Sequence, residues 1–169
     1  MNFDKKSLIA AGFTGFRSFA ELELSQIPQG PGVYAVLMPE GFVPRFLVTS
    51  AGGRFKGKDP SLSKAALSAE WIGGADVLYI GKAGAGKAGR RGLRKRIQEF
   101  ADFSRGLPVG HWGGRLLWQL ADSQALVIAW MELPPNLVDA TEARYHAEFV
   151  ALHGRLPFAN LVQVRSTSR

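Results

Sequence analysis

Three apolar runs of strand length, set at uneven intervals, constrain the fold of this 169-residue chain more than any other feature. They cover residues 33–38, 77–80 and 125–131, and Gly, Pro, Asp or Ser residues that favour turns stand around them. Helical patterns fill some of the intervals, without the regular alternation of a β-α-β fold. We therefore expect an α+β fold in a single domain.

The expected domain has an arm and an insertion. Residues 1–28 are predicted to form an arm or short helix that packs on the domain edge, and residues 29–169 to form the domain itself. Residues 39–73 interrupt it between its first two core strands and include a predicted helix over 61–72. A short apolar patch at residues 46–49 has strand character.

The second half of the chain carries stronger helix signals. Periodicity predicts helices over 93–103 and 137–153, the second ending at Gly154. The apolar runs 116–120 and 125–131, separated by Asp122 and Ser123, predict an extra hairpin. An extended segment over 157–164 closes the chain.

Charge and composition limit the function. Lys and Arg number 21 against 14 Asp and Glu, which gives a net charge of +7 and favours a polyanionic partner. A hydrophobic content of 46% excludes a disordered polycation, and the absence of cysteine excludes disulfide frameworks and thiol catalysis. No apolar run reaches the roughly 20 residues of a membrane span, and the apolar stretch at 8–11 is too short for a signal peptide, so we expect a cytoplasmic protein with no membrane partner.

The positive charge is concentrated in one place. Residues 77–98 contain no acidic residue and seven basic ones: Lys82, Lys87, Arg90, Arg91, Arg94, Lys95 and Arg96. Because glycines precede a predicted helix start here, backbone N–H groups and cations together favour a phosphate-contacting surface over a merely solvated loop. Residues 81–88 match the P-loop pattern up to Lys87. However, Ala88 replaces the Ser or Thr that binds magnesium, so a nucleoside triphosphatase is disfavoured and nucleotide binding at this loop is a minor alternative.

Each of the two long helices places a charged residue on or beside its apolar stripe. At about 100° per residue, Arg96 lies on the shoulder of the stripe, where it either extends to solvent or faces an anion. Glu142 lies within the stripe, and Glu148 at its edge. A carboxylate at that position predicts either a salt bridge to an arginine or a metal site. His146 and His153 are expected to be structural or exposed, and His111 lies in a loop.

The order of these elements resembles the GIY-YIG nuclease superfamily. The first motif is 32–34 (Gly-Val-Tyr) and the second is 78–83 (Leu-Tyr-Ile-Gly-Lys-Ala). Arg96, a helix glutamate and Asn160 of a Pro-x-x-Asn sequence follow in family order. Two departures stand out: the insertion separates the two tyrosine motifs, and Phe100 stands where many members have histidine. Family spacing favours Glu148 as the glutamate, whereas the position on the helix favours Glu142.

The resemblance implies a small three-stranded antiparallel sheet flanked by helices and a metal-dependent endonuclease. It implies that Tyr34 and Tyr79 line the active site, that Arg96 clamps the scissile phosphate, that Glu142 holds Mg²⁺ or Mn²⁺, and that Asn160 orders the site. Tyr34, or else Tyr79, would accept a proton from water if neighbouring cations lower its pKa. We add a set of basic residues as expected nucleic-acid contacts: Lys82, Lys87, Arg90, Arg91, Arg94 and Arg115.

Hydrolysis of nucleic-acid phosphodiester bonds is therefore the expected function, with DNA the favoured partner. The alternative is a module on the same fold that binds nucleic acid without cutting it. The two differ in whether binding and turnover depend on a divalent metal and on Glu142.

Overall fold

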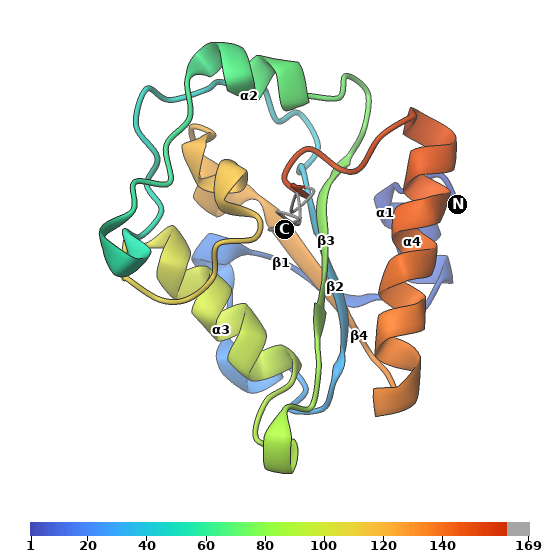
Figure 1. Cartoon of the computed structure of the whole chain (residues 1–169). Helices are drawn as coiled ribbons and strands as arrows, with labels where there is room; N and C mark the ends of the chain where they lie inside the picture. The colour runs from blue at the N-terminus through green and yellow to red at the C-terminus, as the bar shows by residue number, and fades with distance from the viewer. Residues whose placement is uncertain (162–169) are drawn as a thin grey trace, which may run out of the picture.

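Four strands form one antiparallel sheet in the computed structural model, which describes residues 1–161 (Figure 1). The strands are β1 (Thr14–Ser18), β2 (Gly32–Leu37), β3 (Val77–Ala83) and β4 (Val127–Glu132), in the spatial order β1-β4-β2-β3. The α+β class is confirmed. The expected count of three strands was wrong, because β1, from the segment that we expected to be an arm, pairs with β4 and covers an edge that would otherwise be open.

Strand β2 lies inside the sheet and is buried on both faces. Tyr34 and Val36 contribute to the core cluster on one face, whereas Val33, Ala35 and Leu37 contribute to the cluster on the other. Since successive side chains of a strand point to opposite faces, an apolar run without alternation is what a central strand requires.

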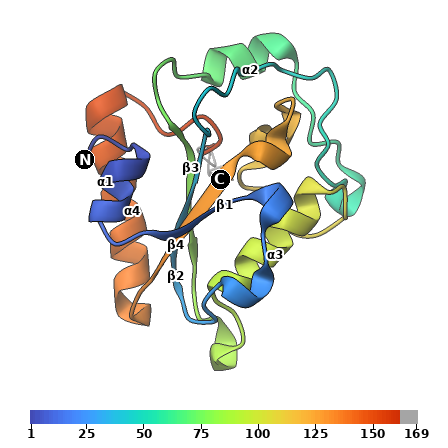
Figure 2. The same ribbon diagram turned by 180° about the vertical axis from the view of Figure 1, so that it is seen from behind.

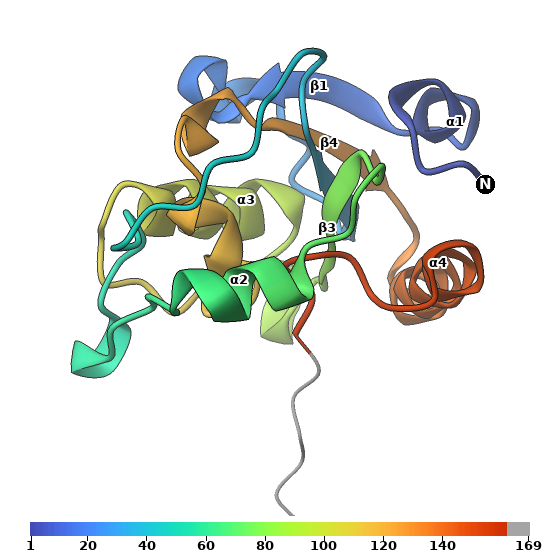
Figure 3. The same cartoon turned by 90° about the horizontal axis from the view of Figure 1, so that it is seen from above.

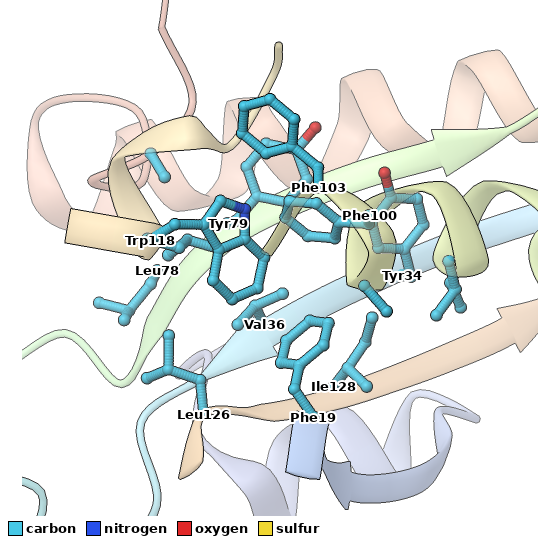
Figure 4. Packing of buried hydrophobic residues seen from close by; sticks show 14 of the residues in the cluster. Phe19, Tyr34, Val36, Leu78, Tyr79, Phe100, Phe103, Trp118, Leu126 and Ile128 are labelled. Atoms are coloured by element: carbon cyan, nitrogen blue, oxygen red, sulfur yellow. The ribbon is translucent and has the colours of Figure 1, made fainter. Parts of the chain in front are cut away.

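Helices cover both faces of this sheet. On one side lie α1 (Lys5–Ala10) and α4 (Val138–His153), and on the other lies α3 (Leu93–Ser104), as Figure 2 shows from behind. The helices predicted from periodicity over 93–103 and 137–153 are confirmed, and Gly154 ends α4 in the left-handed conformation with φ 79°. The core on the α3 side is rich in aromatic rings (Figure 4).

The insertion leaves β2 and returns to β3, and these two strands pair directly with each other, with Ala35 opposite Ile80. The register between them shifts by one residue between Val36 and Leu37, next to the point where the insertion begins. It contains the predicted helix, α2 (Lys64–Glu70), which lies over one end of the α3-side core (Figure 3). The patch at 46–49 forms no strand and contributes one isolated bridge, between Phe46 and Leu120.

The expected hairpin was wrong. Its first arm is a 3₁₀ helix, Arg115–Gln119, and only its second arm is a strand, β4. Leu116, Leu117 and Trp118 are all fully buried. A helical turn that is enclosed by the core can bury successive side chains in this way, whereas a strand with one solvated face cannot.

Gln119 fastens the insertion to the core. Its buried side-chain amide accepts a hydrogen bond from the Leu62 N–H at 2.8 Å and donates to the carbonyl oxygens of Leu62, Leu47 and Val48 at 2.7, 3.1 and 3.2 Å. One side chain thus hydrogen-bonds to the backbone of two separate parts of the 39–73 insertion, residues 47–48 and residue 62.

Replacing Gln119 by leucine is expected to destabilise the protein by roughly 2–3 kcal/mol, because the variant removes four hydrogen bonds that join the insertion to the core. Chemical denaturation measures the loss. Gln124→Leu, which removes a single hydrogen bond to Ser104, is the matched control and should cost clearly less. Equal losses in the two variants would contradict the anchoring role.

The last described residues run along the free edge of β3. Ala159 donates its N–H to the carbonyl oxygen of Leu78 at 2.9 Å. The segment closes the edge without forming a regular strand, and residues 162–164 of the predicted extended segment lie outside the described residues. Within 1–161, no helix combines the length and the apolar character needed to cross a membrane.

Candidate active site

A pocket of about 330 Å³ opens where β3, the start of α3 and the first turns of α4 meet. Three elements that are distant in the sequence therefore contribute to it. Of the expected catalytic residues, Tyr79, Arg96 and Glu142 line the pocket, and of the expected phosphate contacts, Lys82 and Arg91 do so. Its remaining lining residues are Ala83, Gly84 and Gly92.

The two tyrosines lie together because of the strand register. Tyr34 of β2 stands opposite Gly81 of β3, and Tyr79 precedes Gly81 by two residues, so their ring centroids are 5.9 Å apart. A Cβ atom on residue 81 would lie 2.7 Å from the Tyr79 ring and 2.8 Å from the Tyr34 ring. Glycine at position 81 is thus a steric condition for this tyrosine pair.

Tyr34, which we expected to line the active site, packs against Tyr79 but does not itself line the pocket. Its side chain is fully buried and its hydroxyl group has no hydrogen-bond partner within the described chain. Burial raises the pKa of Tyr34 well above its usual value, and burial also raises the pKa of Tyr79. The expected lowering of the pKa by neighbouring cations is therefore not met, since burial outweighs the nearby Arg96 charge.

A carboxylate that sequence analysis missed holds two arginines beside the pocket. Glu99 accepts two hydrogen bonds from Arg91, at 2.8 and 2.9 Å, and one longer bond of 3.4 Å from Arg96. Helical periodicity places Arg96 and Glu99 as i,i+3 neighbours, whereas Arg91 lies before α3 and only the tertiary structure brings it to Glu99. Arg96 keeps 28% of its side chain exposed and lines the pocket, so it does not extend fully into solvent.

Glu142 is paired with a lysine, where we expected an arginine or a metal. The Lys82 ammonium nitrogen lies 2.8 Å from Glu142 and 3.1 Å from Asp139, one turn earlier in α4. These carboxylates raise the pKa of Lys82, with the Glu142 hydrogen bond the largest cause. Glu142 is only 18% exposed and Asp139 is 86% exposed. Asp139 was missed because it lies outside the apolar stripe.

Glu148 lies away from this pocket. Its carboxylate pairs with Arg144 at 3.1 Å and with the N-terminal amino group at 3.7 Å, beside α1. Between the two glutamates that sequence analysis left open, the geometry therefore favours Glu142.

Asn160 supports the site from outside the pocket. Its side chain accepts a hydrogen bond from the Ile80 N–H at 2.8 Å and donates to the Ile80 carbonyl oxygen at 2.7 Å. This bidentate contact fixes the edge of β3 next to Tyr79. The His146 ring nitrogen also lies 3.3 Å from the Ile80 oxygen, which agrees with its expected structural role.

The remaining basic residues divide by what they contact. Lys87 and Arg90 lie exposed in the loop before α3. Arg94 donates to the carbonyl oxygens of Ile27 and Ser25 at 2.8 and 3.3 Å. Arg115 places its guanidinium group over the Trp112 ring at 4.8 Å, away from the pocket lining.

Two of the N–H groups at the start of α3 are not available to an anion, contrary to our expectation. The N–H groups of Leu93 and Arg94 donate to the carbonyl oxygens of Gly30 and Pro28, at 2.9 and 3.0 Å. Backbone carbonyls therefore satisfy two of the free donors of the helix start. Phosphate binding here depends on side chains.

His111 is a buried member of the same region. It is fully buried, stacks on Phe100 with centroids 4.1 Å apart, and neither ring nitrogen has a partner within residues 1–161. Burial, together with the Arg96 charge, holds the pKa of His111 well below its usual value. Its place in a glycine-rich loop gave no sign of this burial.

A pH-dependent loss of stability follows from His111. As pH falls below about 6.5, the His111 imidazole becomes protonated in the unfolded chain, whereas in the folded chain it stays neutral. The free energy of unfolding therefore decreases by up to about 1.4 kcal/mol per pH unit. His111→Gln should lose this contribution. Denaturation of both proteins between pH 7.5 and 5 measures it, and identical slopes would contradict the buried neutral imidazole.

The pocket offers one carboxylate to a metal. Within the described chain, no three His, Asp or Glu side chains group to hold an ion. Mg²⁺, however, commonly binds one or two carboxylates, keeps several waters and shares the phosphate of its substrate. Glu142, in an open pocket beside the basic side chains Lys82, Arg91 and Arg96, fits that pattern, with Asp139 as a neighbouring acid.

Comparison with known proteins adds no relative. A scan against protein-family models and searches of curated proteins and of solved structures found no match. The resemblance to the GIY-YIG superfamily therefore stays a prediction from the sequence motifs.

Proposed function

We propose that this protein is a metal-dependent endonuclease that hydrolyses DNA phosphodiester bonds at a GIY-YIG-like site. The observation that supports this most is the convergence of Tyr79, Lys82, Arg96 and Glu142 on one open pocket, from β3, α3 and α4. An anionic diester needs cations around its non-bridging oxygens, and this pocket supplies three of them, counting Arg91.

Arg96 is the proposed clamp of the scissile phosphate. Its guanidinium group donates in a planar fork that matches two phosphate oxygens. In the free protein its only ion pair within residues 1–161 is the long contact with Glu99, so an arriving phosphate displaces little. Lys82 is the proposed second contact, since its flexible ammonium group reaches the same pocket.

The tyrosines act as proton donors in this proposal. Because burial raises both pKa values, Tyr34 and Tyr79 keep their hydroxyl protons at neutral pH. Tyr79, at the pocket wall, donates a hydrogen bond to a phosphate oxygen or to the attacking water. Tyr34 supports it from behind and holds the ring in place.

Glu142 would hold the metal once Lys82 turns to the phosphate. When bound, Mg²⁺ or Mn²⁺ supplies Lewis-acid stabilisation of the charge that develops on the diester. Lys82 would then exchange Glu142 for the incoming phosphate, and its charge would keep an anionic partner.

Cleavage of labelled duplex, flap and branched DNA with Mg²⁺, Mn²⁺ or chelator tests this function. We expect metal-dependent products from the wild type and a loss of at least about 100-fold in Glu142→Gln. Glu148→Gln is the matched control on the same helix and should cut normally. Cleavage that persists in chelator, or that is lost in the control instead, would contradict the assignment, as would inactivity toward every substrate.

One observation favours the alternative of a binding module without turnover. The only carboxylate in the pocket lining is already neutralised by Lys82, an arrangement that is stable without a metal. That function predicts salt-dependent DNA binding that is indifferent both to chelator and to Glu142→Gln.

A further inference from the structure

A second cavity, of about 240 Å³, lies beside the candidate active site. The two cavities share Arg91, so they are adjacent on the surface formed by the loop before α3 and its first turns. Its charged lining residues are all cations, and two glutamines add amide groups. The full lining is Gln29, Gly89, Arg90, Arg91, Arg94, Lys95 and Gln98.

The two cavities differ in how their charges are balanced. In the candidate active site, Lys82 faces Glu142, and Arg91 and Arg96 face Glu99. In the second cavity, neither Arg90 nor Lys95 forms an ion pair within the part of the chain that the structure describes. Positive charge is therefore compensated in the first cavity, whereas in the second Arg91 is compensated by Glu99 and Arg90 and Lys95 are not.

Hydrogen bonds hold one side of the second cavity together. Arg94 is fixed by its bonds to the carbonyl oxygens of Ile27 and Ser25, which hold the side chain without cancelling its charge. The N–H groups of Leu93 and Arg94 bind the 28–30 segment to the helix and close the floor. Arg90 and Lys95 project from this backbone with exposed side chains, which leaves both charges accessible to an anion.

We propose that this cavity is a phosphate subsite for a strand whose scissile phosphate lies in the active site, an inference that rests on the nuclease function proposed above. Arg91 stands between the two phosphates. The ligand class is a polynucleotide long enough to reach both cavities, and a mononucleotide or a small phosphodiester would miss the second one. Affinity then comes mainly from the uncompensated cations, and turnover from the compensated ones.

Binding tests the subsite without turnover. Fluorescence anisotropy of a labelled DNA duplex in chelator gives affinity against salt concentration. Arg90→Gln and Lys95→Gln should each weaken binding and lower the slope of log K against log salt by about 0.9, the value for one lost phosphate contact. Lys64→Gln, at the exposed start of α2, removes the same charge elsewhere and should leave the slope unchanged.

Kinetics separate the subsite from the catalytic pocket. In the double variant Arg90→Gln/Lys95→Gln, KM for an oligonucleotide should rise while kcat is kept, and hydrolysis of bis(p-nitrophenyl) phosphate should not change. Slopes equal to those of Lys64→Gln would overturn the subsite, and so would equal losses on the small diester and the oligonucleotide. If the wild type cuts neither substrate, the nuclease function fails, whereas the binding slopes still decide whether the cavity holds phosphate.

Discussion

Arg96→Ala is expected to lower kcat for DNA cleavage by about 10²- to 10³-fold while DNA affinity stays close to that of the wild type. Two guanidinium groups line the pocket, those of Arg91 and Arg96. Glu99 binds Arg91 through two hydrogen bonds of 2.8 and 2.9 Å but contacts Arg96 only at 3.4 Å, so the Arg96 guanidinium group is the one that no carboxylate within residues 1–161 holds bidentately. It is therefore free to follow the charge that grows on the phosphate. Steady-state rates and anisotropy in chelator measure the two effects.

Two further variants test whether the effect of Arg96→Ala is specific to its guanidinium group. Arg96→Lys keeps the charge but loses the fork and should recover only part of the rate. Arg105→Ala, at the end of the same helix, removes an exposed arginine that pairs with Asp102 and should leave the rate unchanged. A parallel loss of affinity and rate in Arg96→Ala would show that this residue binds DNA uniformly and does not act on the transition state.

Gly92→Ala is expected to destabilise the fold by about 3 kcal/mol or more, which corresponds to a decrease in Tm of roughly 10 °C. Gly92 has φ 144°, and a Cβ atom there would lie 2.0 Å from the carbonyl oxygen of Gln29. That backbone cannot give way easily, because the N–H groups of Leu93 and Arg94 bind the adjacent carbonyls. The start of α3, and with it Arg96, would have to shift.

Thermal and chemical denaturation measure this loss. Gly84→Ala is the matched control in the same pocket wall, since no atom lies within 4 Å of its would-be Cβ and its φ is not positive. It should change the free energy of unfolding by less than about 1 kcal/mol. Similar stability of the two variants would mean that the contact of α3 with the 28–30 segment is looser than the structure shows.

The parts of the fold that could be predicted from the sequence are the long segments with a clear hydrophobic pattern. Helices α3 and α4 and strand β2 bury stripes or runs that are legible in the sequence. Strand β1 was missed because Gly15 and Phe16 have positive φ and interrupt its pairing with β4 by a bulge. A five-residue apolar run is also equally compatible with a strand and with the buried 3₁₀ turn that residues 115–119 form.

The pocket lining was predictable in part, since it includes Tyr79, Arg96 and Glu142 but neither Tyr34 nor Asn160, and its electrostatics were not predictable. The position of Glu142 on the helix stripe placed it correctly at the pocket. Its partner, Lys82, lies on another element, and only the tertiary structure shows that β3 and α4 meet there. The tyrosine pKa values likewise depend on burial, which the strand register determines and the motif does not.

Diffraction at the manganese absorption edge tests the central claim most directly, with crystals that hold Mn²⁺ and a short DNA strand blocked against cleavage. We predict an anomalous peak at coordination distance from the Glu142 carboxylate and a DNA phosphate within hydrogen-bond reach of Arg96. A peak at Glu148 with none at Glu142, or DNA seated away from this pocket, would contradict the account.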